Sequence, residues 1–194
     1  MVVIRSASAA DAGQIAAVMQ ASWRAAYAGI MAPEVIDRVT AADGGARVRQ
    51  SFRTRPWQET IVAIAQPEPA RKRAARDGIV GYAFFGPETD VLGARWPHPL
   101  SPAGQRGQVA ELYALYVHPA SWSTGTGRAL MDRVLDATSV AGYLSVRLWV
   151  LRENARARRF YERAGFAPDG ASHTLEGLGG VTEIRYGRRL TPGA

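Results

Sequence analysis

The chain has 194 residues, of which 47% are hydrophobic and 21% charged, so it can form one sizeable packed core but is short for two domains. It has no cysteine, which excludes a disulfide scaffold, a thiol nucleophile and a thiolate metal site, and its three scattered histidines give no spacing suited to zinc. The net charge of +7 is compatible with an anionic partner.

Two kinds of partner are not expected. No apolar run reaches the roughly 18 residues that cross a bilayer, and the first residues lack the features of a secretory signal, so we expect a cytoplasmic protein without a membrane partner. Residues 71–76 form the densest basic cluster, but no aromatic residues interleave with the charges to stack on bases. This cluster therefore predicts a solvated loop rather than a nucleic-acid surface. A homodimer is left open.

The first segment predicts an edge strand followed by a helix. Residues 2–5 read as the strand, and Ser8 and Asp11 have the spacing of a capping box with Asp in place of Glu. The helix that follows should end near Gly29. Its apolar face consists of Ala12, Ile15, Met19 and Ala26. Trp23 and Tyr27, four residues apart, form an aromatic stripe beside this face.

Two shorter helices and two paired antiparallel strands come next. Their expected bounds are 33–39 and 46–54 for the helices, and 60–65 and 79–85 for the strands. Two segments rich in turn-forming or basic residues, 66–76 and 86–107, predict loops or insertions. The longer of them contains Trp96, a candidate for a lid.

The last part of the chain predicts a β-α-β unit, then a helix and two strands. The expected elements are a strand at 109–117, a helix at 126–141, a strand at 145–150, a helix at 155–164, a strand from 166, and a strand at 181–186. There is no internal repeat or domain linker. The order of elements therefore predicts a single α/β domain with a mixed sheet.

The junction between the strand at 109–117 and the next helix has the features of an anion site. Gly125 and Gly127 precede or open the helix, where free backbone N–H groups and the helix dipole attract phosphate. The loop is neither a Walker A sequence nor a dinucleotide fingerprint, because the Gly-Lys-Ser/Thr ending and the third glycine are absent. A Gly-x-Gly pair is also common in plain tight turns, so further support is needed.

A second segment supplies that support. Residues 154–166 begin with Asn154, continue through Phe160 and Tyr161, and end in Gly165-Phe166. Together with residues 117–130, they make the chain resemble the GNAT superfamily of acetyl-CoA-dependent N-acetyltransferases, over nearly its full length except the two expected loops. One departure is Thr124, where the family usually has Gln or Arg. Ser123 or Arg128 would have to compensate by donating a hydrogen bond to the phosphate.

The resemblance implies a single GNAT-like domain over residues 1–194, with a mixed, mostly antiparallel twisted sheet whose central strands splay and are flanked by helices. Acetyl-CoA, the acetyl donor, would enter the gap between the splayed strands, and no metal is implied. The residues implied at the donor are Leu115, Tyr116 and Val117 through the main chain, Ser123, Thr124, Gly125, Thr126, Gly127, Arg128 and Ala129 at the diphosphate, and Asn154, Ala157 and Phe160 on the following helix. Asn154 fits the role of a helix N-cap equally well.

Acetyl transfer to an amine requires a neutral amine and a proton for the departing thiolate. We expect Glu111 to be the base, since it is the only acid between Asp90 and Asp132. Tyr161 resembles the family tyrosine that faces the thioester sulfur, and we expect it to be the acid. The structural alternatives are a solvated charge near the strand end for Glu111 and core packing with Phe160 for Tyr161.

Three aromatic residues, Trp23, Tyr27 and Tyr113, are the candidates for binding the acceptor, although each could equally be part of the core. The expected function is transfer of an acetyl group from acetyl-CoA to a primary amine by direct attack in a ternary complex. The sequence does not name the amine. The alternative is a non-catalytic acyl-CoA-binding or sensing module, which would need neither Glu111 nor Tyr161.

Overall fold

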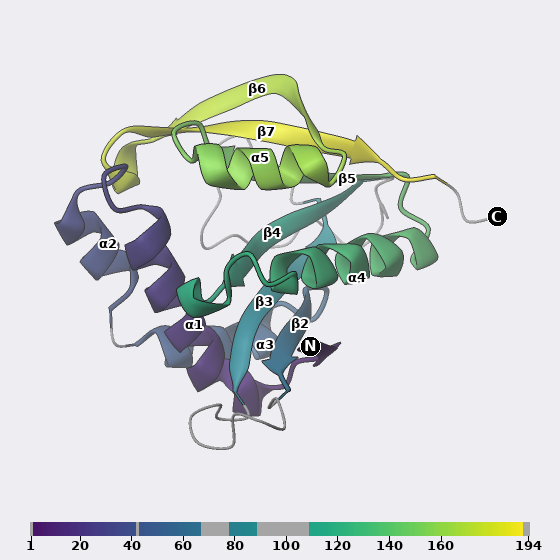
Figure 1. Cartoon of the computed structure of the whole chain (residues 1–194), viewed down its shortest axis with the longest axis horizontal. Coiled ribbons are helices and arrows are strands. Elements are labelled where there is room, and N and C mark those ends of the chain that lie inside the picture. The colour runs from purple at the N-terminus through teal and green to yellow at the C-terminus, as the bar shows by residue number, and fades with distance from the viewer. Residues whose placement is uncertain (1, 42, 67–77, 89–108, 192–194) are drawn as a thin grey trace.

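The computed structural model describes residues 2–41, 43–66, 78–88 and 109–191, which form one α/β domain around a seven-stranded sheet (Figure 1). The strands are β1 (Val2–Ser6), β2 (Glu59–Ala65), β3 (Ile79–Pro87), β4 (Val109–Val117), β5 (Ser145–Leu151), β6 (Ala167–Leu175) and β7 (Val181–Arg189). Their order in the sheet is β1-β2-β3-β4-β5-β7-β6. Every pairing is antiparallel except that of β4 with β5, which is parallel.

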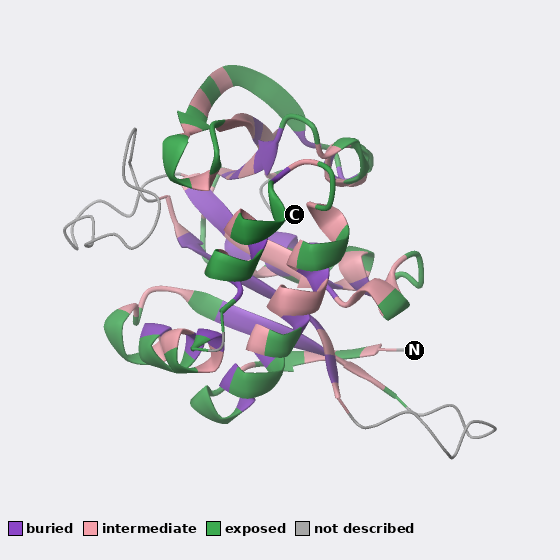
Figure 2. Cartoon of the chain, turned by 90° about the vertical axis from the view of Figure 1, so that its left-hand side faces the viewer, coloured by how far each residue is buried: buried purple, intermediate pink, exposed green. Residues whose placement is uncertain are grey.

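Helices cover both faces of the sheet. They are α1 (Ala12–Ala26), α2 (Pro33–Val39), α3 (Gly44–Thr54), α4 (Thr126–Val140) and α5 (Ala155–Arg163). Alternate residues of β2 show the two faces, since Ile61 packs in the core under α4 and α5 whereas Val62 packs against α1 and α3. Figure 2 shows that the buried residues are concentrated in the sheet and on the inward sides of the helices. Within the described ranges, no helix has the length and apolarity needed to cross a membrane.

The fold class expected from the sequence is confirmed, and most element bounds agree within one or two residues. The edge position of β1 and the antiparallel pairing of β2 with β3 are also confirmed. The strand expected at 79–85 extends to Pro87, into the expected loop 86–107. The remainder of that loop from residue 89, with Trp96, and residues 67–77, with the basic cluster, lie outside the described residues.

The first helix differs in its inward face. The buried positions of α1 are Ala12, Ile15, Val18 and Ser22, whereas Met19 and Ala26 are only half-buried. Ser22 escaped the sequence analysis because it is polar, but its hydroxyl donates a hydrogen bond of 2.8 Å to the carbonyl oxygen of Val117. A buried hydroxyl with such a partner avoids the cost of an unsatisfied polar group. This bond ties α1 to the end of β4.

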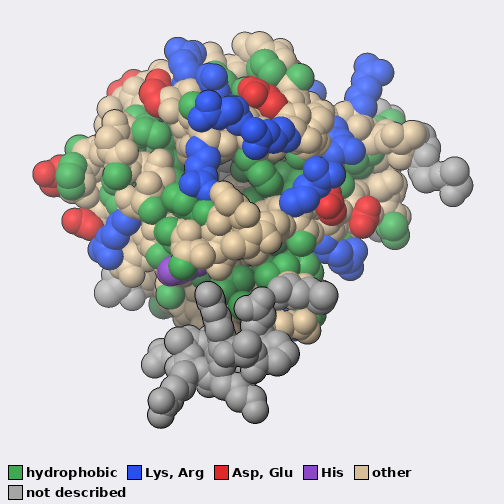
Figure 3. Space-filling model, viewed as in Figure 1, with side chains coloured by type: hydrophobic (Ala, Val, Ile, Leu, Met, Phe, Trp, Pro, Cys, Tyr) green, Lys and Arg blue, Asp and Glu red, His purple; other side chains and the backbone are tan. Residues whose placement is uncertain are grey.

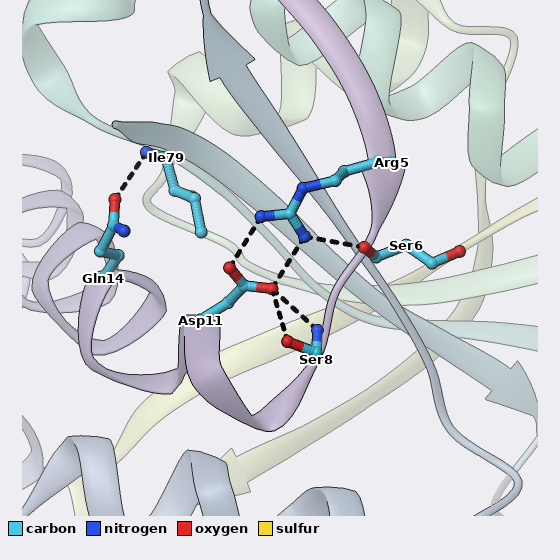
Figure 4. Close-up of polar contacts among 6 residues, drawn as sticks. All are labelled: Arg5, Ser6, Ser8, Asp11, Gln14 and Ile79. Carbon is cyan, nitrogen blue, oxygen red and sulfur yellow. Dashed lines mark hydrogen bonds and ion pairs between the residues drawn. The ribbon is translucent and has the colours of Figure 1, made fainter. Parts of the chain in front are cut away.

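Asp11 connects β1 to the start of α1 (Figure 4). Its carboxylate accepts two hydrogen bonds of 2.8 Å from the guanidinium of Arg5 and one of 2.8 Å from the backbone N–H of Ser8, as the capping box predicts. The hydrogen bond from Arg5 is the largest cause that lowers the pKa of Asp11 from 3.8 to about 2. The ionised form of Asp11 is therefore favoured by folding.

We expect Asp11→Asn to lower the free energy of unfolding by about 1 to 2 kcal/mol at pH 7. Because the pKa of Asp11 is lower in the folded state, its contribution is present above pH 4 and is lost as the pH falls toward 2. Urea unfolding of both proteins between pH 3 and pH 7 should show the difference shrinking with acid. Asp37→Asn is the matched control, since its ion pair with Arg24 is exposed and should contribute little. A difference that is the same at both ends of the pH range would contradict this account.

Candidate active site

The site lies where β4 and β5 separate. The two strands are paired only from Val109 to Leu112 on β4 and from Ser145 to Leu148 on β5, although both continue beyond these residues. The pairing of β3 with β4 is also irregular, because Phe84 faces Ala114 and Phe85 faces Leu112, which leaves Tyr113 as an extra residue on β4. A cavity of about 340 Å³ opens between the separated strands and is lined by residues of α1, β4, β5, α5, β7 and the loop before α4.

The loop from β4 to α4 has the backbone expected of an anion-binding turn. Ser123 has a φ of 62°, the one positive φ of a non-glycine residue in the described ranges, and Gly125, the N-cap of α4, has a φ of 88°. The first N–H groups of a helix have no partner within it, so α4 presents free donors at this point. Ser123, Gly125, Gly127 and Arg128 line the cavity.

Three loop residues expected at the diphosphate do not line the cavity. Ala129 donates its N–H to the carbonyl of Gly125, so this group belongs to the first hydrogen bond of α4 and is not a free donor. The hydroxyl of Thr124 donates to the carbonyl of Ser121 at 2.9 Å and contacts the hydroxyl of Thr126 at 3.0 Å. Thr126 is buried. None of Thr124, Thr126 and Ala129 is among the residues that line the cavity.

Helix α5 forms the opposite wall. Asn154 is its N-cap, since its side-chain oxygen accepts a hydrogen bond of 3.0 Å from the N–H of Ala157, and it also lines the cavity. Both interpretations of Asn154 are therefore compatible with its position. Ala157, Phe160 and Tyr161 line the cavity as well. The rings of Phe160 and Tyr161 lie 5.3 Å apart, so Tyr161 is both a packed core residue and a wall of the cavity.

The mouth of the cavity carries positive charge. Arg128 and Arg156 are lining residues, and the guanidinium of Arg156 lies 3.8 Å from the ring centre of Trp122. The indole N–H of Trp122 donates to the same Val117 carbonyl that Ser22 contacts, at 2.7 Å. Figure 3 shows Lys and Arg side chains gathered around a hollow that contains hydrophobic side chains. Such a rim attracts an anionic ligand.

The two residues expected to carry the chemistry are separated by the structure. Tyr161 lines the cavity, whereas Glu111 does not. Glu111 lies on β4 opposite Gly86 of β3 and Arg147 of β5 and is only 4% exposed, so the alternative of a solvated charge near the strand end is wrong. It is near enough to Tyr113 to contribute, after burial, to raising the pKa of that phenol.

The aromatic residues expected at the acceptor are partly brought together. Tyr27 and Tyr113 line the cavity, and the hydroxyls of Tyr27 and Tyr116 share a hydrogen bond of 3.2 Å. Burial, followed by Tyr116, raises the pKa of Tyr27 well above its usual range, so its phenol stays neutral. Trp23 packs edge-on against Tyr27 with ring centres 4.8 Å apart but is not a lining residue. Trp23 thus supports the wall from behind.

Sequence reasoning missed the lining residues on the C-terminal strands, among them Trp149 of β5 and Glu183 of β7. The ring centres of Trp149 and His173 lie 4.3 Å apart, and the imidazole Nε2 of His173 lies 3.5 Å from a carboxylate oxygen of Glu183. A hint was present in the sequence, since Glu183 is an acid inside a strand of alternating character. Its proximity to Tyr27, the residue that follows α1, could not be read from that pattern.

Comparisons with known proteins agree on one family. The model of the Acetyltransferase (GNAT) family matches residues 41–166. The chain is 28% identical over 189 residues to the probable N-acetyltransferase Rv2775 of Mycobacterium tuberculosis, covering 96% of this chain and 92% of that protein. It is 50% identical over 58 residues to the mycothiol acetyltransferase of Beutenbergia cavernae, which is 30% of this chain and 20% of that protein. The chain thus matches a fifth of the length of that enzyme.

A solved structure has the same fold. The crystal structure of PaiA N-acetyltransferase from Thermoplasma acidophilum in complex with coenzyme A superimposes with a TM-score of 0.71 at 19% sequence identity. The similarity covers 97% of this chain and 99% of that one.

Proposed function

The chain belongs to the GNAT family of acetyltransferases, and we propose that it transfers the acetyl group of acetyl-CoA to a primary amine by direct attack in a ternary complex. The observation that carries this proposal is that one cavity is lined by a helix N-terminus, a separated strand edge and Tyr161. These three features correspond to the three parts of the donor, namely its phosphates, its amide-containing arm and its thioester.

The phosphate end of acetyl-CoA would bind at the start of α4. The free N–H groups of the first turn and the helix dipole favour an anion there, and Arg128 and Arg156 add charge at the rim. Arg128 is also paired with Asp132, at 2.8 Å and one turn further along α4, which keeps its guanidinium near the rim. Thr124 contributes no side chain to the cavity, so Ser123 and Arg128 would take the role that Gln or Arg has in relatives.

The extended arm of the donor would follow β4. Beyond Leu112, β4 has no partner in β5, so one edge of Tyr113, Ala114 and Leu115 faces the cavity. Amides of the ligand can pair with such an edge in the same way as an added strand. This arrangement would place the thioester between β4 and Tyr161.

In the proposed reaction, the nitrogen of the acceptor loses two protons, one before and one after it attacks the thioester. The amine enters as an ammonium ion and first loses one proton to a base. Its lone pair then attacks the thioester carbonyl carbon and forms the C–N bond, and a backbone N–H of β4 would stabilise the oxyanion. Collapse of the intermediate breaks the C–S bond, the thiolate takes the proton of the Tyr161 hydroxyl, and the second proton of the nitrogen restores the phenol.

The position of each carboxylate limits how it could act as the base. Glu111, expected from the sequence, would have to act through water, because its carboxylate is buried outside the lining of the cavity. Glu183 is the carboxylate that lines the cavity itself.

The proposal predicts release of free CoA thiol when acetyl-CoA is mixed with a suitable amine. We expect turnover with at least one class in a screen of monoamines, polyamines, amino acids, aminoglycosides and peptide N-termini, detected with a thiol reagent. Mass spectrometry of the product should show the amine heavier by one acetyl group. If acetyl-CoA binds but no amine in the screen releases thiol, the non-catalytic acyl-CoA-binding module becomes the better description.

A further inference from the structure

We propose that Glu183 holds the ammonium group of the acceptor and takes its proton, and that the acceptor is a primary amine with no carboxylate beside its amino group. This inference rests on the proposed function and adds to it a residue and a class of substrate. It is based on the position of Glu183, the aromatic groups around it, and the distribution of charge along the cavity.

Glu183 lies at the centre of the C-terminal part of the sheet. It is in register with Leu151 of β5 on one side and with His173 of β6 on the other. Its side chain is 12% exposed and is a lining group of the cavity. A carboxylate so far removed from solvent interacts more strongly with a cation than an exposed one does.

Aromatic side chains line the same cavity as this carboxylate. Trp149 packs against His173, which lies 3.5 Å from the carboxylate, and Tyr27 and Tyr116 are also lining residues. Glu183 lies close enough to Tyr27 to be one of the charges that raise the pKa of that phenol. An ammonium ion near the faces of such rings gains cation–π attraction in addition to its ion pair. The hydroxyls of Tyr27 and Tyr116 offer hydrogen-bond acceptors as well.

Charge is divided between the two ends of the cavity. Of the described residues that line it, three are charged: Arg128 and Arg156 at the donor mouth, and Glu183 as the one acid. Arg185, two residues along β7, is bound to Asp169 at 2.7 Å and is not a lining residue. The two lining arginines would thus attract the anionic acetyl donor, and Glu183 would attract the cationic acceptor. A carboxylate next to the amine of a free amino acid would be repelled by Glu183.

The proton step follows from this position. The ammonium donates one proton to the carboxylate of Glu183, which becomes neutral as the amine becomes neutral. His173, at 3.5 Å from the carboxylate, is the adjacent group that can accept this proton and pass it to water. The carboxylate is then ready for the next ammonium ion. No other reactant is needed.

The test compares the binding of three probes of similar shape to the full chain saturated with CoA, by isothermal titration calorimetry at pH 6.5, where the amino group of phenylalaninamide is mostly protonated. Phenylalaninamide has the ammonium and no carboxylate, phenylalanine has both, and 3-phenylpropanamide has neither. We expect the wild-type protein to bind phenylalaninamide about 10-fold or more tightly than either of the others. Glu183→Gln should remove most of this preference and leave the affinity for 3-phenylpropanamide unchanged.

Two further variants serve as controls. Glu176→Gln removes an acid from the turn between β6 and β7, outside the cavity lining, and should retain the wild-type preference. Glu111→Gln should also retain it, because Glu111 does not line the cavity. Equal or undetectable binding of the three probes to the wild-type protein, or a preference that survives Glu183→Gln, would overturn the inference. Because binding is measured without acetyl transfer, a protein that shows the preference but no turnover would contradict only the proposed function.

Discussion

Replacing Gly127 by Glu should abolish the rise in melting temperature that CoA gives to the wild-type protein. Gly127 lies in the first turn of α4 and lines the cavity, so a carboxylate there would occupy the anion site and repel phosphate. With free CoA at 100 times its dissociation constant, the wild-type protein should gain about 2.7 kcal/mol of stability, which is a shift of about 5 to 10 °C. The variant should show no shift in differential scanning calorimetry.

Two variants separate loss of binding from loss of folding. A Cβ atom at Gly127 would lie 3.4 Å from the ring of Phe160, an ordinary van der Waals distance, so Gly127→Ala should fold and keep most of the shift. Gly177→Glu makes the same substitution in an exposed turn where no atom lies within 4 Å of the added Cβ, and should keep all of it. A folded Gly127→Glu protein with a normal CoA shift would place the anion site elsewhere.

Tyr161→Phe should lower kcat by about 100-fold or more while leaving CoA binding unchanged. The substitution keeps the ring, which packs against Phe160 and Phe166 with ring centres 5.3 and 6.1 Å away, and removes only the hydroxyl. In the proposed reaction this hydroxyl protonates the departing thiolate, and a general acid fails once it is deprotonated. We therefore expect the activity of the wild-type protein to decline at alkaline pH and that of the variant to lack this decline.

The matched control is Tyr186→Phe. The hydroxyl of Tyr186 donates to Glu162 at 2.9 Å, and Tyr186 is buried but does not line the cavity. Loss of this hydroxyl should lower the free energy of unfolding, with little effect on kcat measured below the melting temperature. If Tyr161→Phe turned over at the wild-type rate across the pH range, the thiolate would leave without an acid, and positioning would account for catalysis.

The order and type of the elements could be predicted because each depends on local pattern. The glycine loop is an example, since Gly125 has the positive φ that its place before α4 requires, and this property is visible in the sequence itself. The motif at Asn154 likewise predicted both a helix start and a cavity wall, and both describe its position.

The chemistry of individual carboxylates could not be predicted in the same way. Glu111 was expected to be the base, with a solvated charge near the strand end as the alternative, yet pairing of β4 with strands on both sides buries it. Glu183 was missed because its position depends on β7 entering the sheet between β5 and β6. The register pairs of β5 with β7 join residues that are 32 positions apart for Leu151 and Glu183 and 44 positions apart for Ser145 and Arg189. Whether a charged group meets solvent, a partner or a cavity is decided by such distant pairings.

The separation of β4 from β5 also affects the tendency of this protein to aggregate at high concentration. A strand edge that lacks a partner is normally a template on which other chains build intermolecular sheet, and this leads to aggregation. Here the edge of β4 that has no partner in β5 beyond Leu112 faces a cavity whose lining includes Tyr161 and Tyr27. A slender ligand can pair with this edge, whereas a strand of another protein, with side chains on both faces, would clash with these walls. In the proposed complex, the sheet would therefore offer an open edge to the donor without exposing that edge to other chains.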